Sequence, residues 1–184
     1  AGRAQFFMLD SNRVADPEQT NWLDRELAAS QAQVKVAVYH HPGLTAGLHE
    51  NSLAVQQRWM PLFEQHGVDL VLNGHNHGYE HSVQNGVDYV VTGGGGARIY
   101  PCVDDQPWLI TCIAVNHFLI VEHIHCHRFA TRHFEQREIE FGHDEVTQRH
   151  GAEQSIRFRI HDVARVDRFL LASDRTNMFE SVTD

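Results

Sequence analysis

Two short, almost uninterrupted apolar runs constrain the fold of this 184-residue chain more than any other feature. They occupy residues 34–39 and 68–72. Runs of this kind are typical of strands in a sheet that is covered on both faces. A strand pattern at residues 6–9 and two helical patterns accompany them. The alternation of strand and helix predicts an α/β fold for the first two thirds of the chain.

The two predicted helices have recognisable ends. The first should begin at Asp16, whose side chain can cap it, with Pro17 in the first helical position. The second covers residues 53–66, and we expect Pro61 to kink or split it. Gly67 should end this second helix, because glycine readily takes the left-handed conformation found there.

The pattern changes after residue 85, and the rest of the chain is predicted to be mostly β. The segment at residues 126–154 is polar and rich in histidine, and we assign it no element. Turns separate the expected strands, which cover residues 87–91, 108–115, 118–125, 155–160 and 165–171.

Charge and hydropathy exclude two classes of partner. The net charge is −9, with 15 Lys and Arg against 24 Asp and Glu, whereas nucleic-acid binding needs clustered cations. The longest apolar run, residues 108–115, is far shorter than the roughly 20 residues that cross a bilayer, so no membrane partner is expected. The 15 histidines, as many as all Lys and Arg together, raise the question of a metal.

Cysteine adds little to this picture. Cys102, Cys112 and Cys126 are widely spaced, and no C-x-x-C pair is present. A thiolate zinc site and a disulfide framework are therefore not indicated. We expect the three cysteines to be buried free thiols.

Two histidine clusters directly follow the two buried strands. The first is His40–His41, followed by proline, and the second is the pair His75 and His77, which follows a glycine. Ligands of open α/β sheets bind beyond the carboxyl ends of the strands, so both clusters can face one crevice. In an extended segment His75 and His77 would point the same way. The sequence therefore predicts one site at this edge of the sheet, and two unrelated surface loops are the alternative.

The two clusters and their flanking residues resemble a known family. Residues 38–42 (VYHHP) and 67–82 (GVDLVLNGHNHGYEHS) resemble the last two metal-binding blocks of the calcineurin-like metallophosphoesterases. The match is closest to the purple acid phosphatase-like branch, whose block reads G-H-x-H followed by a small residue, Tyr and Glu. The resemblance covers roughly residues 4–123. It implies an α/β fold, in which a metallophosphoesterase-like β-sandwich is flanked by helices.

The resemblance also implies roles for single residues. His40 and His75 match ligands of the second metal, and His77 matches a ligand of the first. His49 matches a histidine that contacts phosphate or protonates the leaving group, so it is the catalytic candidate. His49 and Asn76 are the predicted substrate-binding residues.

The activity that the resemblance implies is metal-dependent hydrolysis of phosphate monoesters by a hydroxide held between two metal ions. The cofactors would be two divalent or trivalent ions among Fe, Zn and Mn, and the partner a small-molecule phosphate ester. Neutral imidazoles suit these metals, and two ions can clamp the phosphate oxygens during an in-line displacement. The alternatives are a phosphodiesterase of the same superfamily and a non-catalytic metal- or phosphate-binding remnant.

The earlier blocks of the family are missing from the chain. They read D-x-H, G-D-x-x-D or G-D-x-x-Y, and G-N-H-E or G-N-H-D, and they supply the carboxylate ligands; none occurs in this sequence. Two dications 3.5 Å apart repel each other by about 19 kcal/mol at an effective dielectric constant of about 20, and three neutral histidines cannot offset this repulsion. We therefore expect the isolated chain to bind at most one metal weakly and to be inactive.

The simplest account is the C-terminal half of a longer phosphoesterase whose N-terminal half is missing. Residues 1–125 would be the C-terminal part of the metallophosphoesterase domain, and residues 126–184 a β-rich C-terminal extension of it. No signal peptide is visible, and the sequence leaves the compartment open. The resemblance makes a secreted or periplasmic location one option.

The remaining features favour structural roles. Gly93–Gly96 is interpreted as a tight loop, with a phosphate cradle as the alternative. His41 is expected to support a ligand from behind or to face solvent, and His81 to be structural. Exposed strand positions are favoured over a second metal site for His117, His123, His125, His127 and His133.

Overall fold

The computed structural model describes residues 4–103, 105–125, 143–148 and 154–162. It divides into two compact units, Ala1–Val115 and Asn116–Asp184, and each is described here by itself. The predicted boundary at 125/126 falls within the second unit, at the end of one of its strands. None of the helices in the described part of the chain is long and apolar enough to cross a membrane.

A six-stranded mixed sheet forms the first unit, in the order β1-β2-β3-β5-β4-β6. The pairs β1–β2, β2–β3 and β3–β5 are parallel. Strand β4 pairs antiparallel with both β5 and β6. Their bounds are Ala4–Met8 (β1), Val34–Val38 (β2), Leu70–Asn73 (β3), Tyr79–Gln84 (β4), Val87–Thr92 (β5) and Leu109–Ile113 (β6). The predicted α/β class is confirmed, and the buried strands expected at 34–39 and 68–72 are present as β2 and β3, with β3 beginning two residues later than expected.

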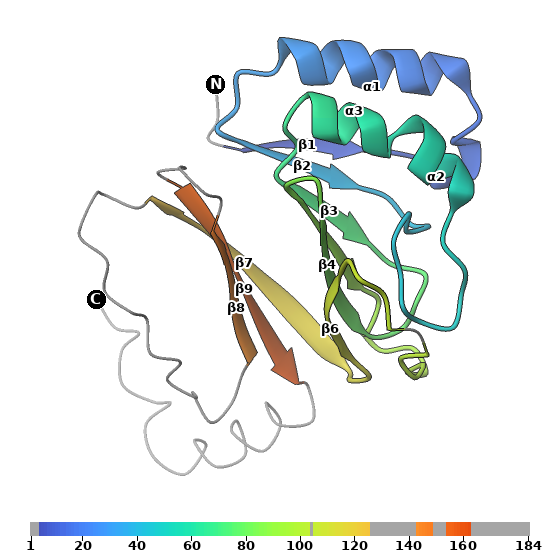
Figure 1. Cartoon of the computed structure of the whole chain (residues 1–184), viewed down its shortest axis with the longest axis vertical. Helices are drawn as coiled ribbons and strands as arrows, with labels where there is room; N and C mark the ends of the chain where they lie inside the picture. Colours follow the sequence, from blue (N-terminus) through green and yellow to red (C-terminus); the bar gives the residue numbers. More distant parts are fainter. Residues whose placement is uncertain (1–3, 104, 126–142, 149–153, 163–184) are drawn as a thin grey trace, which may run out of the picture. The chain divides into compact units, whose positions relative to one another are not determined.

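Helices cover one face of the β1–β3 part of this sheet (Figure 1). After a 3-10 turn at Ser11–Arg13, they are α1 (Pro17–Ala29), α2 (Leu53–Arg58) and α3 (Met60–Gln65). Asp16 caps α1 as predicted, since its side chain accepts a hydrogen bond from the backbone N–H of Glu18. The predicted split near Pro61 is also confirmed, and Gly67 follows α3 with φ of +63°.

The core lies between the helices and the sheet. Phe7 of β1 is buried on the helix side, whereas Phe6 and Met8 on the other side of the strand are exposed. Tyr39, directly after β2, packs against two aromatic rings: the ring of Trp59, between α2 and α3, is 5.2 Å away, and the ring of Phe63 in α3 is 6.0 Å away, centroid to centroid. These contacts fix the carboxyl end of β2, where the first histidine cluster begins.

Strand β4 was not predicted from the sequence. It forms a hairpin with β5 through Asn85 and Gly86, which both have positive φ, at +49° and +80°. An Asn-Gly pair between two strands is the preferred sequence for such a two-residue turn. The sequence signal for this hairpin was therefore present at residues 85–86. Strand β4 begins two residues after His77, so the second histidine cluster leads directly into the sheet.

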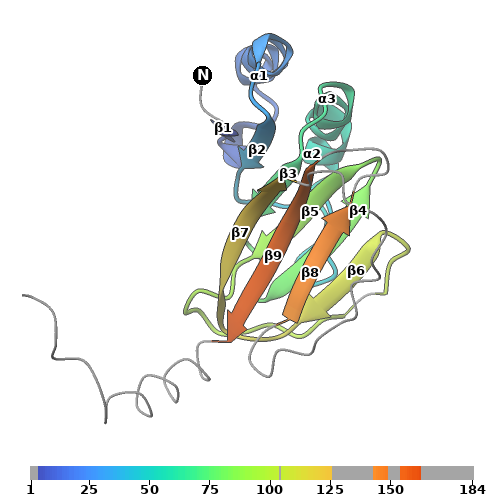
Figure 2. The same ribbon diagram turned by 90° about the vertical axis from the view of Figure 1, so that its left-hand side faces the viewer.

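An antiparallel three-stranded sheet forms the second unit, in the order β7-β9-β8 (Figure 2). Its strands are β7 (His117–His125), β8 (His143–Gln148) and β9 (Gln154–Asp162). The strands predicted at 118–125 and 155–160 are confirmed, and β8 lies in the segment to which no element was assigned. The strand expected at 165–171 lies outside the described residues, as do His127 and His133. His117 begins β7 as a strand residue, but its side chain is buried, which corrects the exposed position expected for it.

The expectation of three free thiols is wrong for two of the cysteines. Cys102 and Cys112 form a disulfide, with Cα atoms 6.1 Å apart. Cys112 lies in β6, and Cys102 lies in the irregular segment that leads to this strand. A separation of ten residues carries no recognisable spacing signal, so only the fold of the connecting segment brings the two sulfurs together.

Candidate metal centre

The two histidine clusters are joined where β2 and β3 end. The Tyr39 N–H donates to the Leu72 carbonyl at 3.1 Å, and the Gly74 N–H donates to the His40 carbonyl at 3.2 Å. The parallel pairing of the two strands is thereby continued past their ends. The histidines that follow each strand must then lie at the same edge of the sheet.

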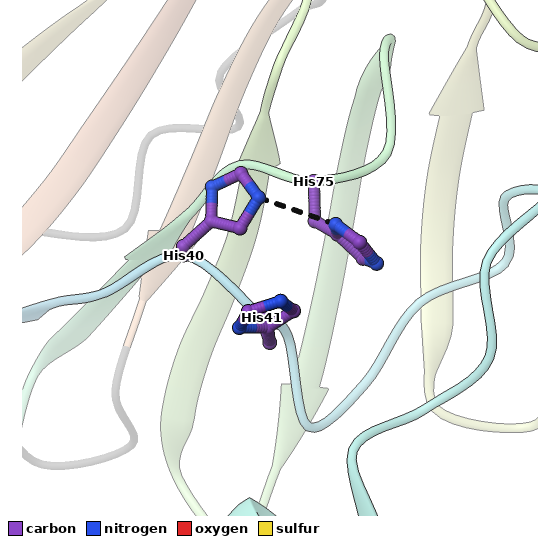
Figure 3. Close-up of side chains that lie close together, drawn as sticks. All are labelled: His40, His41 and His75. Atoms are coloured by element: carbon purple, nitrogen blue, oxygen red, sulfur yellow. Dashed lines mark hydrogen bonds between the residues drawn. The ribbon is translucent and has the colours of Figure 1, made fainter. Parts of the chain in front are cut away.

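Three imidazoles meet at this edge. The possible ligand atoms of His40, His41 and His75 all lie within 4.8 Å of one another, and the His75 Nδ1 is 3.2 Å from the His40 Nε2 (Figure 3). The ring centroids of these histidines are 4.6 to 5.0 Å apart. The structure thus gathers two of the predicted ligands, and it adds His41 to them.

His41 is held by Ser11, the first residue of the 3-10 turn that follows β1. The buried Ser11 hydroxyl oxygen accepts a hydrogen bond from the His41 backbone N–H at 3.0 Å. The same oxygen lies 2.9 Å from the His41 Nδ1. This contact leaves the Nε2 of His41 as the nitrogen available to a ligand when Nδ1 carries the proton. The role of His41 could not be read from the sequence, because it depends on a turn at Pro42 and on a side chain 30 residues away.

The segment at residues 74–78 is bent, which corrects the extended conformation assumed for it. His75 has φ of +69°, a conformation that few residues other than glycine adopt. Asn76 is buried, with 1% of its surface exposed, while the histidines on either side of it are partly exposed. A left-handed histidine at the end of a buried strand is the kind of backbone strain that is retained at functional sites.

Partial burial, and after it the charge of neighbouring imidazoles, lowers the pKa of two of these histidines, His75 and His40. Partial burial, followed by repulsion from His49 and the neighbouring histidines, lowers the pKa of His75 to about 4. Burial first and then His41 lower the pKa of His40 as well. Both shifts favour the neutral form of the ring, which is the form that binds a metal ion.

His49 lies beside the three imidazoles. Its ring stacks on that of His75, with centroids 4.1 Å apart. The Asn76 amide oxygen accepts a hydrogen bond from the His49 backbone N–H at 2.9 Å. The Nδ2 of Asn76 donates to the hydroxyl of Thr45. Asn76 therefore positions the loop that carries His49, and its predicted contact with substrate stays a prediction.

His77 lies outside the three-imidazole group, against a different segment. Its Nδ1 is 2.8 Å from the carbonyl oxygen of Arg98, and its ring stacks on Tyr100 with centroids 4.3 Å apart. A carbonyl oxygen only accepts hydrogen bonds, so Nδ1 must carry the proton. The neutral ring then presents Nε2 as a ligand atom, in the arrangement that metal-binding histidines usually have.

The backbone of Gly93 packs closely against the backbone of the 74–78 turn. A Cβ atom added to Gly93 would lie 2.1 Å from the carbonyl oxygen of Asn76, and the Gly93 N–H donates to the carbonyl of Gly78. Only glycine can occupy position 93 in this arrangement. The observation favours packing of the 74–78 turn as the role of this residue.

His81, which follows in β4, has the structural role that was expected for it. It is buried, and its Nε2 lies 2.8 Å from the Asp88 Oδ1 in the neighbouring strand β5. Both side chains of this pair are buried, so the pair belongs to the interior of the sheet.

The donor set fits a metal ion. Tetrahedral ligands at about 2.05 Å from zinc lie about 3.3 Å apart, which is close to the separation of His40 Nε2 and His75 Nδ1. Within the described residues, the group of three contains imidazoles and no carboxylate. Such a set matches one ion of borderline character, such as Zn²⁺.

Comparison with known proteins gives relatives that match part of the chain. No family model matches. The chain is 36% identical over 86 residues to purple acid phosphatase 7 of Arabidopsis thaliana, which is 47% of this chain and 26% of the relative. It is 36% identical over 75 residues (40% and 20%) to purple acid phosphatase 3 of the same plant. It is also 31% identical over 78 residues (42% and 24%) to human tartrate-resistant acid phosphatase type 5.

Solved structures share the fold. The purple acid phosphatase PPD1 from yellow lupin matches with a TM-score of 0.55 and 19% identity, over 64% of this chain and 26% of that one. GAP50, the anchor in the inner membrane complex of Plasmodium, matches with a TM-score of 0.56 and 18% identity, over 62% and 41%. The metallophosphoesterase-like α/β fold and the resemblance to purple acid phosphatases are confirmed, although the matched segment spans only about a quarter of the curated relatives.

Proposed function

We propose that this chain carries part of the active site of a metal-dependent phosphate monoesterase. The observation that carries the proposal is the convergence of His40, His41 and His75 within 4.8 Å at the carboxyl end of the parallel strands. The relatives that match part of this chain include purple acid phosphatase 7 and tartrate-resistant acid phosphatase type 5, which are hydrolases. Two bound metal ions would supply Lewis-acid activation of water and phosphate.

The residues of this chain would bind and orient the reactants. His40 and His75 are the proposed ligands of one ion, and His77 is the proposed ligand of the other through its Nε2 atom. His49, stacked on His75, is the proposed contact to the phosphate and the proton donor to the leaving oxygen. His41, supported by Ser11, reaches the same group of ligand atoms.

A second candidate is a non-catalytic module that binds a metal ion or phosphate. It is favoured by the composition of the three-imidazole group, which has no carboxylate among the described residues. Carboxylates neutralise the charge of a second dication, so the isolated chain should hold one ion at most. A phosphodiesterase would use the same histidines, and only its substrate would differ.

Metal content and turnover of p-nitrophenyl phosphate test the proposal. The measurements use both the 184-residue chain and the product of the whole reading frame that encodes it, with Fe, Zn or Mn supplied. We expect the chain to bind one ion without turnover, and a longer product with carboxylate blocks to hydrolyse the ester. In that product His75→Ala and His77→Ala should lower metal content and reduce kcat/KM at least tenfold.

His66→Ala is the matched control. His66 bonds to Asp24 at 2.6 Å and lies on the helical side of the first unit, so its removal should leave metal content and turnover unchanged. Unchanged metal content in both His75→Ala and His77→Ala would show that the site assignment is wrong. Full activity of the 184-residue chain would show that these residues need no further carboxylates.

A further inference from the structure

We propose that Tyr100 is a positioning residue, which holds the His77 and His49 imidazoles in place from a disulfide-tethered segment. The segment comprises residues 98–103 and is called the tether segment below. The consequence for catalysis rests on the proposed function. The positioning itself is a property of this chain alone, and it can be measured without metal or substrate.

Tyr100 and Arg98 both contact His77 and together fix its position. The Tyr100 ring lies nearly parallel to the His77 ring, at an interplanar angle of 15° and a centroid distance of 4.3 Å. The Tyr100 backbone N–H donates to the His77 carbonyl at 2.9 Å, and the Arg98 carbonyl accepts from the His77 Nδ1 at 2.8 Å. The ring plane, the tautomer and the backbone of His77 are thus all set by two residues of the tether segment, Arg98 and Tyr100.

The same tyrosine ring also meets His49. The two ring centroids are 5.4 Å apart with an edge-to-face angle of 72°, a favourable arrangement for aromatic rings. Farther along the tether segment, the Val103 N–H donates to the Ala46 carbonyl at 2.9 Å, in the loop that carries His49. Tyr100 therefore lies between two histidines that come from different loops, and its segment is bonded to both loops.

The tether segment has no regular secondary structure in the described part of the chain. The described residues between β5 and β6 include no helix or strand, so no ladder of backbone hydrogen bonds fixes them. The Cys102–Cys112 disulfide joins the segment to β6, where Cys112 pairs with Glu80 of β4. Strand β4 starts two residues after His77, so the disulfide closes the tether segment back onto the strand that continues from the His77 turn. A cross-link of this kind reduces the conformations open to a segment without regular structure.

Plain hydrophobic packing is the rival explanation for Tyr100. Packing needs only a side chain of similar volume, whereas positioning by stacking needs an aromatic ring. Tyr100→Phe keeps the ring and removes the hydroxyl, and Tyr100→Leu keeps apolar volume and removes the ring. Trp22→Leu removes an aromatic side chain from the outer surface of α1 and serves as the matched control.

The first measurement is NMR of the metal-free chain with ¹³C-labelled histidine. A stacked aromatic ring shifts the protons above its face upfield, and His77→Gln identifies the His77 signals among the 15 histidines. We expect upfield His77 ring protons in the wild type, in Tyr100→Phe and in Trp22→Leu. In Tyr100→Leu, and in a Cys102→Ser/Cys112→Ser double variant, the shift should be lost or much reduced. Persistence of the shift in Tyr100→Leu would overturn the proposal.

The second measurement is Zn²⁺ affinity by calorimetry on the same variants. Loss of a partner that orients a metal-binding histidine weakens metal affinity by about 10- to 100-fold, so we expect about tenfold weaker binding in Tyr100→Leu and wild-type binding in Tyr100→Phe. Equally weakened Zn²⁺ binding in Tyr100→Phe and Tyr100→Leu would show that the aromatic ring of Tyr100 does not orient His77. If the wild type binds no metal but the NMR result holds, the proposed function fails and the positioning of His77 by Tyr100 stands.

Discussion

The Nδ1 of His75 lies 3.2 Å from the Nε2 of His40, although the two residues are 35 positions apart in the chain. This separation is close to that expected for two nitrogen ligands of one tetrahedral ion, which is about 3.3 Å. It results from the hydrogen bond that the Gly74 backbone N–H donates to the His40 carbonyl, which continues the pairing of β2 and β3. The pairing of the two strands thus places these nitrogens at a separation that suits two ligands of one ion.

His41→Ala should weaken Zn²⁺ binding by the 184-residue chain by about tenfold or more, because it removes one of three clustered imidazoles. Calorimetric titration measures the change. His66→Ala, outside the cluster, is the control. Unchanged affinity in His41→Ala would show that His41 only supports the site, as its sequence position suggested.

Replacement of His75 should separate stability from binding. His75 has φ of +69°, so His75→Gly should be about 1 kcal/mol more stable than His75→Ala in urea unfolding, since both lose the imidazole but only alanine keeps the strain. Both variants should lose Zn²⁺ affinity alike. Equal unfolding midpoints would contradict a strained backbone at this position.

Gly93→Ala should destabilise the first unit by about 1–3 kcal/mol, because the added Cβ would meet the Asn76 carbonyl oxygen at 2.1 Å. Gly95→Ala is the matched control, since an added Cβ there has no neighbour within 4 Å. Thermal or urea unfolding of both variants measures the difference. Similar stabilities would mean that the turn after β3 relaxes freely around a side chain.

Glu80 should make stability depend on pH. Burial raises the pKa of the Glu80 carboxyl, while hydrogen bonds from Ala46, Thr45 and Gly47 lower it less. A raised folded pKa contributes stability below the ordinary value of a glutamic acid, and this stability is lost as pH rises through the folded pKa. We therefore expect wild-type stability to fall relative to Glu80→Gln between the ordinary pKa and the raised one. Parallel stability curves across this range would contradict the raised pKa.

Removal of the Cys102–Cys112 disulfide should cost about 3 kcal/mol of unfolding free energy, as the loop-entropy model gives for a ten-residue separation. Urea unfolding of the Cys102→Ala/Cys112→Ala variant against the wild type measures it. Peptide mapping after alkylation provides the control, because the two cysteines should react only after reduction. Alkylation of either residue in the unreduced protein would show that the bond is absent.

Much of the fold could be predicted because its signals are local. Pro61 marks the split between α2 and α3, and Asp16 marks the start of α1, since each acts through its own backbone or its nearest neighbours. Strand β4 was missed although Asn85 and Gly86 announce its turn. The meeting of the two histidine blocks could be predicted because strand ends in a parallel sheet share one edge, whereas the ligand roles of His40 and His75 came from the family resemblance.

Other parts of the site depend on contacts between distant segments. His41 enters the cluster only because Ser11 holds it, and Tyr100 reaches His77 only because an irregular segment folds back over the turn after β3. The pairing of Cys102 with Cys112 is of the same kind. No periodicity or spacing encodes such contacts, since they join segments without regular structure.

Local signals along the chain are enough to predict the alternation of strands and helices and the position of two histidine blocks at strand ends, because hydrophobic periodicity and backbone stereochemistry act over a few residues. The meeting of particular imidazoles, the left-handed conformation of His75 and the stacking of Tyr100 on His77 arise only in the folded chain. Those outcomes follow from packing between segments far apart in the chain, where a difference of an ångström separates a ligand from a neighbour.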